Sequence, residues 1–202
     1  MTANRSPSKK GKFVRADDFF NTLRRAIHPD FLCQPQAGKL EHIEQHHDGT
    51  TSCFCLKPSS QMVAFSLDKR GKEPFGILAP GLDSKNDLTL VCLDANKRPL
   101  VFVIECKNSG SIGNAQHQIE CGIAFCKYLF QLIVFVHDIK MTPRFFGVAV
   151  YRPKFPPKGT TRPQFVTVGQ NGILRATWHL DVELPLTELI RAAEATRLSG
   201  CK

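Results

Sequence analysis

A short apolar segment that ends in charged residues constrains the fold of this 202-residue chain more than any other feature. Residues 100–104 are apolar at every position, which is typical of a strand covered on both faces of a sheet. Glu105-Cys106-Lys107 follows directly. Side chains two positions apart on a strand share a face, so Glu105 and Lys107 are expected to point the same way. Charges at the end of a buried strand need a cleft or a partner, because burying them alone costs free energy.

A second apolar segment lies just before the first one. It covers residues 88–93, and the turn-like residues 94–99 join the two segments, so the pair is predicted to form a β-hairpin. This hairpin would carry Asp87, at the head of its first strand, back beside Glu105 and Lys107. Two carboxylates and an amine at one end of a sheet can hold a divalent cation and a water next to a phosphodiester. The pattern therefore indicates a metal-dependent nuclease.

Other interpretations of the acidic positions stay open at this point. Asp83 and Asp94 are rivals of Asp87, although Asp94 lies where the hairpin should turn. Asp87 is favoured over both because it stands directly before the strand. Asp87 could also be the last residue of a plain turn, and Glu105 and Lys107 could form a solvated ion pair on an edge strand.

The arrangement of Asp87, Glu105 and Lys107 resembles the restriction-endonuclease-like superfamily, also called the PD-(D/E)xK nucleases. In that family an acidic residue at the start of one strand precedes an acid-any-lysine triplet on the next, and a helix follows. The resemblance ends at the helix expected after Gly113 and covers roughly a quarter of the chain. It implies an α/β fold, a restriction-endonuclease-like sandwich with a central mixed β-sheet flanked by helices. It also implies cleavage of DNA, in preference to RNA, in a restriction, defence, repair or mobile-element setting.

The resemblance also implies roles for these residues. Asp87 and Glu105 would bind Mg²⁺ or Mn²⁺, and the backbone carbonyl of Cys106 would be a further oxygen ligand. The side chain of Cys106 is expected to point away into the core. Lys107 would position the attacking water and offset the charge that develops on phosphorus.

A glutamine on the following helix often lines the site in the resembled family. Gln118 fits this catalytic role better than Gln116, because Gln118 leads the apolar face of the predicted helix over residues 114–132. Gln116 is kept as a candidate contact to nucleic acid.

Metal-capable side chains also gather upstream, in a segment over residues 38–47 that is predicted as a short helix. The resemblance implies one further acidic metal ligand from the helix ahead of the sheet. Glu44 is the candidate, with Glu41 and His42 as alternatives. A structural zinc site is another possibility, although no Cys-x-x-Cys pair supports it. Its ligands would come from His42, His46, Cys53 and Cys55.

The formal net charge of +9 favours a polyanionic partner. Residues 1–15 hold five bases and no acid, whereas the other 22 bases face 18 acids. We therefore expect a disordered basic arm over residues 1–15 and a single nuclease-like domain over residues 16–202. A solubilising tail and a surface loop that happens to be basic are the plain alternatives. The candidate nucleic-acid contacts are Lys9, Lys10 and Lys12 in the arm and Arg152, Lys154 and Lys158 in a proline-rich stretch.

Hydrophobic periodicity and turn residues predict the other elements, and their mixed order fits one α/β sandwich. Helices are expected at residues 16–27, 38–47, 114–132 and 185–197. Strands are expected at residues 52–57, 62–67, 75–78, 88–93, 100–105, 145–151, 165–168 and 173–179.

Several classes of protein are disfavoured. The most apolar stretch, residues 123–136, contains Lys127 and Gln131, so no membrane span is expected, and no secretory segment follows the first methionine. The eight cysteines are then expected to be reduced, in a cytoplasmic, nucleoid or nuclear protein. A homodimer or a larger nucleoprotein complex is possible. The alternative functions are a catalytically inactive nucleic-acid-binding subunit with the same fold, and an interaction domain in which the triplet is incidental.

Overall fold

The computed structural model of the chain describes residues 15–45, 51–58, 61–69, 71–78, 84–107, 112–139, 141–151, 166–168, 173–177 and 183–199. These residues form α-helices, one short 3-10 helix and strands in two sheets. The helices are α1 (Ala16–Ala26), the 3-10 helix (Pro29–Phe31), α2 (Ile112–His137) and α3 (Leu186–Ser199). The strands are β1 (Leu32–Cys33), β2 (Leu40–Gln45), β3 (Thr51–Lys57), β4 (Met62–Phe65), β5 (Leu88–Leu93), β6 (Pro99–Lys107), β7 (Arg144–Tyr151), β8 (Val166–Val168), β9 (Leu174–Thr177) and β10 (Leu184–Pro185).

The larger sheet is mixed, and β6 lies in its interior. Its strand order is β1-β4-β5-β6-β7-β9-β8. β5 and β6 form the expected antiparallel hairpin, with Leu88 opposite Ile104. β7 runs parallel to β6 on the other side, and α2 supplies the crossover that a parallel pair requires. The smaller sheet has the order β10-β3-β2.

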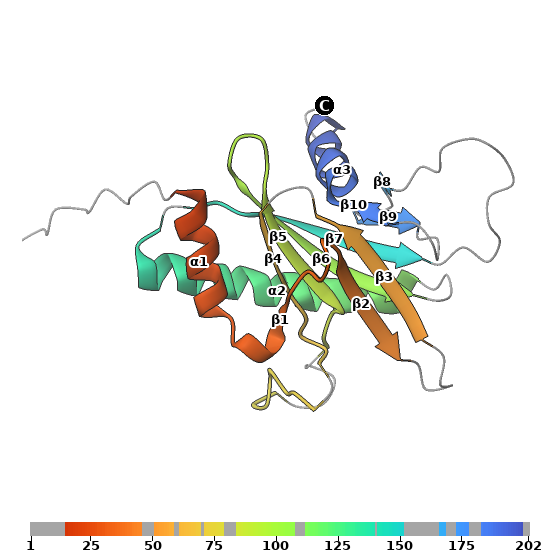
Figure 1. Cartoon of the computed structure of the whole chain (residues 1–202), viewed down its shortest axis with the longest axis horizontal. Helices are drawn as coiled ribbons and strands as arrows, with labels where there is room; N and C mark the ends of the chain where they lie inside the picture. The colour runs from red at the N-terminus through yellow and green to blue at the C-terminus, as the bar shows by residue number, and fades with distance from the viewer. Residues whose placement is uncertain are drawn as a thin grey trace, which may run out of the picture.

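Alternate residues of β6 face two separate apolar cores. Val101 and Val103 pack with α1 and α2, whereas Phe102 and Ile104 pack with β2, β3 and α3. Figure 1 shows α2 passing behind β5, β6 and β7, while β2 and β3 lie in front of them. The molecule therefore has helices on one face of the large sheet, and the small sheet with α3 on the other. The expected α/β class with a central mixed sheet is confirmed.

Two glycines let α2 approach the large sheet closely. A Cβ added to Gly122 of α2 would lie 2.4 Å from Oδ1 of Asn86 and 2.6 Å from a methyl carbon of Val103. A Cβ added to Gly147 of β7 would lie 2.4 Å from a methyl carbon of Ile119. Such short contacts would force neighbouring atoms to move, so any larger residue would push the helix away from the sheet. The absence of a side chain at these two positions therefore sets the height of α2 above the sheet.

α2 is longer and more apolar than the sequence pattern indicated. By length and composition alone, Ala115–His137 is apolar enough to cross a membrane, although it contains Lys127 and Gln131. The expectation that no stretch of this kind exists is therefore not supported. Its inner face is buried against the sheet, whereas Phe135 near its end is 86% exposed. A core helix of a globular domain passes the same test, so the helix does not decide whether the protein meets a membrane.

Most of the other expected elements are present near their predicted positions. α1, β3, β5, β6, β7 and α3 lie where periodicity predicted them, and β4 is shorter than expected. β8 and β9 lie near the strands expected at residues 165–168 and 173–179, and they pair antiparallel. The predicted apolar face of α3 is buried through Leu186, Leu189 and Ala193.

The helix predicted over residues 38–47 is wrong. This part of the chain forms β2, which pairs antiparallel with β3 and places Leu40 opposite Leu56. The spacing of three between Glu41 and Glu44 is a local pattern, and cross-strand pairing overrides it. The strand predicted over residues 75–78 is also wrong, because this segment is a turn in which the N–H of Leu78 donates to the carbonyl of Phe75 at 2.7 Å.

The described cysteines behave as small core or partly buried residues. Cys33, Cys92, Cys121 and Cys126 are free thiols. Burial raises the pKa of Cys92 and of Cys126 to about 12. These two thiols therefore stay protonated at neutral pH, where a thiol is a poor nucleophile.

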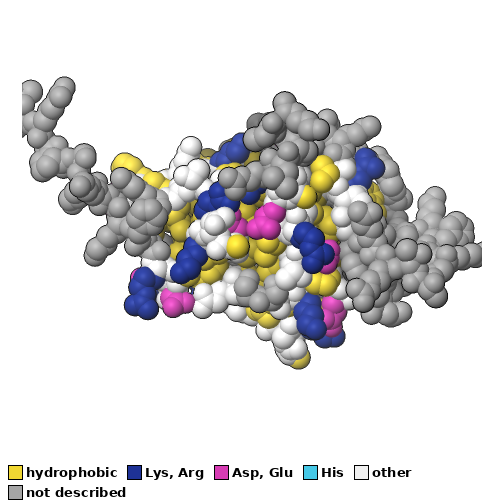
Figure 2. All heavy atoms as spheres, turned by 90° about the horizontal axis from the view of Figure 1, so that it is seen from above, with side chains coloured by type: hydrophobic (Ala, Val, Ile, Leu, Met, Phe, Trp, Pro, Cys, Tyr) yellow, Lys and Arg dark blue, Asp and Glu magenta, His cyan; other side chains and the backbone are white. Residues whose placement is uncertain are grey.

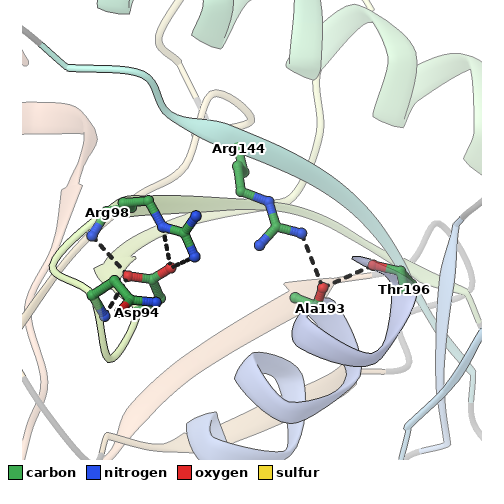
Figure 3. Close-up of polar contacts among 6 residues, drawn as sticks. Asp94, Arg98, Arg144, Ala193 and Thr196 are labelled. Carbon is green, nitrogen blue, oxygen red and sulfur yellow. Dashed lines mark hydrogen bonds and ion pairs between the residues drawn. The ribbon is translucent and has the colours of Figure 1, made fainter. Parts of the chain in front are cut away.

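Asp94 closes the turn of the β5–β6 hairpin, as expected for a turn residue. Its Oδ1 atom accepts hydrogen bonds from the backbone N–H groups of Asn96 and Arg98 at 2.9 and 2.8 Å. Its Oδ2 atom accepts one from Nε of Arg98 at 2.8 Å (Figure 3). Burial alone would raise the pKa of Asp94, but the hydrogen bonds and charge of Arg98 hold it below its usual range. Nearby, Arg144 of β7 donates to the carbonyl of Ala193 in α3 at 3.2 Å (Figure 3).

Replacement of Gly122 by alanine tests the close approach of α2. We expect Gly122→Ala to lower the free energy of unfolding by about 1–3 kcal/mol, because the new methyl group overlaps Asn86 and Val103. Urea unfolding measures this. Gly76→Ala is the matched control, since a Cβ at Gly76 meets no atom within 4 Å. Equal stability of the two variants would contradict the proposed packing constraint.

Replacement of Asp94 by asparagine tests the hairpin turn. At neutral pH we expect Asp94→Asn to lower the free energy of unfolding by about 1–3 kcal/mol, since hydrogen bonds to a charged acceptor are lost. The pKa of Asp94 is lowered in the folded state, so its contribution is present above the unfolded pKa and disappears as the pH falls through the folded one. The stability difference from wild type should therefore shrink below about pH 4. Urea unfolding over a pH series measures it, and a difference independent of pH would be the contrary result.

Candidate active site at the open end of the β5–β6 hairpin

Asp87 and Glu105 come together at the end of the hairpin that lies away from its turn. Leu88 pairs with Ile104, so the next residues outward, Asp87 and Glu105, face each other across the two strands. The backbone N–H of Asp87 donates to Oε2 of Glu105 at 3.3 Å. In return, the backbone N–H of Cys106 donates to Oδ2 of Asp87 at 2.6 Å. The structure thus brings the two predicted acids together, each bound to the other strand.

Lys107 and Gln118 join the same group. Nζ of Lys107 donates to Oε1 of Glu105 at 2.5 Å and to Oε1 of Gln118 at 2.8 Å. Nε2 of Gln118 donates to the backbone carbonyl of Lys85 at 3.0 Å. Gln118 therefore links the segment before β5 to the lysine at the end of β6, and α2 supplies this link from the first part of its length.

All four side chains lie on the face of the large sheet that α2 covers. Glu105 pairs with Ala149 and Lys107 with Tyr151, and both partners belong to the core beneath α2. Cys106 alternates with them, and its side chain lies in the core on the opposite face, as predicted. The thiol of Cys106 is thus kept away from the carboxylates.

The two carboxylates are almost completely buried. Asp87 is 4% exposed and Glu105 is 1% exposed, whereas the side chain of Lys107 is 23% exposed. A solvated ion pair on an edge strand is therefore the wrong description, because β6 lies inside the sheet. Two carboxylates and one ammonium carry a formal charge of −1 when all three are ionised. A divalent cation at this place would offset that charge.

Gln116 and the upstream acids lie elsewhere. Nε2 of Gln116 donates to Oε1 of Glu120 at 2.8 Å on an exposed part of α2, so the structure places Gln118, and not Gln116, beside Lys107. Glu41 and Glu44 belong to β2, which packs over the opposite face of the large sheet from Glu105. The helix expected to carry Glu44 is therefore wrong, and the role of Glu44 as a metal ligand stays a prediction. The side chains of Glu44 and His42 lie outside the described residues.

The zinc alternative loses its basis for the same reason. One turn of a helix would bring His42 and His46 together, but His42 belongs to β2, a strand that ends at Gln45. Among the described residues, no group of three or more His, Cys, Asp and Glu side chains is arranged to hold a metal ion.

Most of the predicted nucleic-acid contacts fall outside the described residues. This holds for Lys9, Lys10 and Lys12, for Arg152, Lys154 and Lys158, and for the rival acid Asp83. The basic arm over residues 1–15 therefore stays a prediction. Figure 2 shows one face of the molecule, on which the described Lys and Arg side chains lie in several separate groups with apolar side chains between them.

Three residues near the site were not among the site residues predicted from the sequence. Asn86 is fully buried, donates from Nδ2 to Oγ1 of Thr89 at 3.1 Å, and lies against Gly122 of α2. Tyr151 and Arg175 reach the site face through the pairing of β6, β7 and β9. Only the position of Asn86, next to Asp87, was visible as a local signal. The other two depend on strand pairing over long sequence separations.

Comparison of the chain with models of protein families, with curated proteins and with solved structures found no match. The interpretation of the site therefore rests on its geometry. The restriction-endonuclease-like assignment of the fold stays a prediction.

Two glutamines on α2 offer a matched test of this geometry. We expect Gln118→Ala to lose about 1–2 kcal/mol of unfolding free energy, because it removes the hydrogen bonds to Lys107 and to the carbonyl of Lys85. Gln116→Ala should stay within about 0.5 kcal/mol of wild type, since its described bond to Glu120 is exposed. Urea unfolding compares the two, and equal losses would contradict the special position of Gln118.

Proposed function

We propose that this protein is a metal-dependent nuclease of the restriction-endonuclease-like type that hydrolyses phosphodiester bonds in DNA. The observation that carries the proposal is the convergence of Asp87, Glu105, Lys107 and Gln118 on one face at one end of the sheet. These residues are distant along the chain, and no packing requirement calls for two buried carboxylates at this place.

The topology around the site supports the finer fold assignment. The acid that precedes one strand and the acid-any-lysine triplet on the next lie in an antiparallel pair, β5 and β6. A helix follows the triplet and leads to a parallel strand, β7. The helix contributes Gln118 to the site. The acid, the triplet and the following helix come in the order that the resemblance to the PD-(D/E)xK nucleases implies.

The donor atoms at the site suit Mg²⁺ or Mn²⁺. Asp87 and Glu105 offer carboxylate oxygens, and hard cations prefer oxygen ligands. The N–H and the C=O of one strand residue point to the same side, so the Cys106 carbonyl is directed to the side where Asp87 accepts the Cys106 N–H. Mg²⁺ usually needs only one or two protein carboxylates, because waters and substrate phosphates complete its shell. When bound, the metal would act as a Lewis acid and lower the pKa of a coordinated water.

Lys107 and Gln118 supply the cationic and orienting groups. The ammonium of Lys107, held between Glu105 and Gln118, is the described cation that directly contacts a site carboxylate. From this position it can donate to a non-bridging phosphate oxygen and offset negative charge in the transition state. Gln118 is a positioning residue, because its contact to the carbonyl of Lys85 fixes the amide that holds Lys107.

The net charge of +9 supports a nucleic-acid substrate, because Lys and Arg side chains bind backbone phosphates. DNA is proposed before RNA on the resemblance alone. A homodimer or a larger nucleoprotein assembly, the cellular location and the biological setting remain predictions.

Cleavage assays with matched variants test the function. Wild type should cut circular or linear DNA in Mg²⁺ and be inactive in EDTA. Glu105→Gln and Lys107→Ala should each lose at least about 10²-fold in rate, since each removes a group that acts on the transition-state charge. Lys127→Ala is the control, because it removes the same charge from the outer surface of α2 and should keep wild-type activity. RNA is assayed in parallel.

Metal binding has its own readout in the same experiment. Mg²⁺ should raise the melting temperature of wild type and not that of Glu105→Gln, because a ligand that binds only the folded state stabilises it. Absence of cleavage by wild type on DNA and RNA, with no thermal shift in Mg²⁺ or Mn²⁺, overturns the proposed function. A thermal shift with nucleic-acid binding and no cleavage would instead indicate the inactive binding subunit.

A further inference from the structure

Strands β7 and β9 extend the site beyond the four residues discussed so far. In the parallel register Lys107 lies opposite Tyr151, and Glu105 lies opposite Ala149. On the other side of β7, Ala149 lies opposite Arg175 of β9. Paired residues of neighbouring strands share a face, so Tyr151 and Arg175 lie on the same face as Glu105 and Lys107.

The neighbours of Arg175 confirm this orientation. Leu174 and Ala176, on either side of it, belong to the core on the opposite face. Glu105, Ala149 and Arg175 therefore form one row across β6, β7 and β9. Two strand spacings separate the ends of the row, so the Cα atoms of Glu105 and Arg175 lie about 10 Å apart. The residue between them is a small, buried alanine, so Arg175 and Tyr151 are the long side chains that stand beside the carboxylates on this flank.

The hydroxyl of Tyr151 is buried and, in the part of the chain that the structure describes, has no hydrogen-bond partner. An unmade hydrogen bond of a buried hydroxyl costs stability, so such a group calls for an explanation. Burial raises the pKa of Tyr151, and the positive charges of Arg175 and Lys107 act in the opposite direction. The hydroxyl is thus protonated at neutral pH, lies within the field of two cations, and can donate a hydrogen bond.

Arg175 is half-buried, and no carboxylate among the described residues pairs with it. A guanidinium that is partly removed from water favours an anion that can accept more than one of its N–H groups, such as a phosphate. On this flank the described groups are two cations and a hydroxyl donor, next to the two acids. The positive charges and the hydroxyl donor would complement the oxygens of a phosphate group, and the two acids beside them would bind the metal.

We propose that Tyr151 and Arg175 bind the phosphate backbone of the nucleic-acid strand beside Asp87 and Glu105, and so position the strand for cleavage. The inference rests on the nuclease function proposed above, and it adds the residues that hold the substrate. Arg175 contributes charge, and the Tyr151 hydroxyl donates to a phosphate oxygen. Lys107 contacts Glu105 and lies opposite Tyr151 in the strand register, so it adjoins both groups.

Binding measurements in EDTA test this inference without any cleavage. Fluorescence anisotropy of a labelled DNA oligonucleotide, single-stranded and duplex, gives the affinity over a series of NaCl concentrations. Arg175→Gln should weaken binding and lower the slope of log affinity against log salt by about 1, as expected for one lost phosphate contact. Arg175→Lys should keep the slope, because it keeps the charge. Tyr151→Phe should weaken binding about tenfold with no change in slope.

Arg191→Gln is the control, because it removes the same charge from an exposed position on α3, where Arg191 pairs with Glu188. Circular dichroism and melting temperature show whether each variant is folded. The inference is overturned if folded Arg175→Gln matches Arg191→Gln in affinity and in salt slope. Should Arg175→Gln fail to fold, wild-type affinity of Tyr151→Phe overturns it.

The two proposals fail in different ways. If Arg175→Gln loses binding but wild type never cleaves, the binding role of Arg175 is supported and the nuclease function is rejected. If wild type cleaves normally but Tyr151→Phe and Arg175→Gln bind as wild type does, the nuclease function is supported and the binding role is rejected. If wild type binds neither DNA nor RNA in EDTA or in Mg²⁺, the inference is overturned outright.

Discussion

Burial of β6 on both faces is the constraint on which the rest of the structure depends. Val101 and Val103 pack under α2, and Phe102 and Ile104 pack against the small sheet and α3, so the strand cannot accept a charge along most of its length. Polar side chains become tolerable only at its last residues. There the backbone N–H of Asp87 donates to Glu105 and that of Cys106 donates to Asp87, so each carboxylate accepts a hydrogen bond across the hairpin. The site is thus located where the apolar core ends.

The second constraint is the height of α2 above the sheet. The lack of a side chain at Gly122 and Gly147 leaves room for Asn86 and Ile119 at two points of close approach. Because the helix is rigid and Gln118 lies one turn before Gly122, this packing also sets where the amide of Gln118 meets Lys107. Packing of the core and geometry of the polar group are therefore coupled through one helix. A site supported in this way can keep its side chains in position before a ligand arrives.

The site also has an asymmetry of charge that a purely structural ion pair would not need. Asp87 stands directly before β5 and Glu105 is on β6, whereas the further cation and the buried hydroxyl come from β9 and β7. Lys107 contacts Glu105 on one side and is paired in register with Tyr151 on the other. A phosphodiester with a divalent cation has the complementary arrangement, because the metal requires the acids and the phosphate oxygens require the donors.

Local sequence patterns were sufficient for the parts of this protein in which a residue's role depends on its near neighbours. The apolar runs on both sides of a short turn determined the β5–β6 hairpin, and the hairpin by itself determined that Asp87, Glu105 and Lys107 meet. The helical face of α2 indicated Gln118 in preference to Gln116 for the same reason. Tertiary structure decided the rest. Pairing with β3 made the segment around Glu44 a strand, because cross-strand hydrogen bonds outweighed a weak local helix pattern. The register of β7 and β9, set by burial over long sequence separations, brought Tyr151 and Arg175 to the acids, and no local pattern encodes that contact.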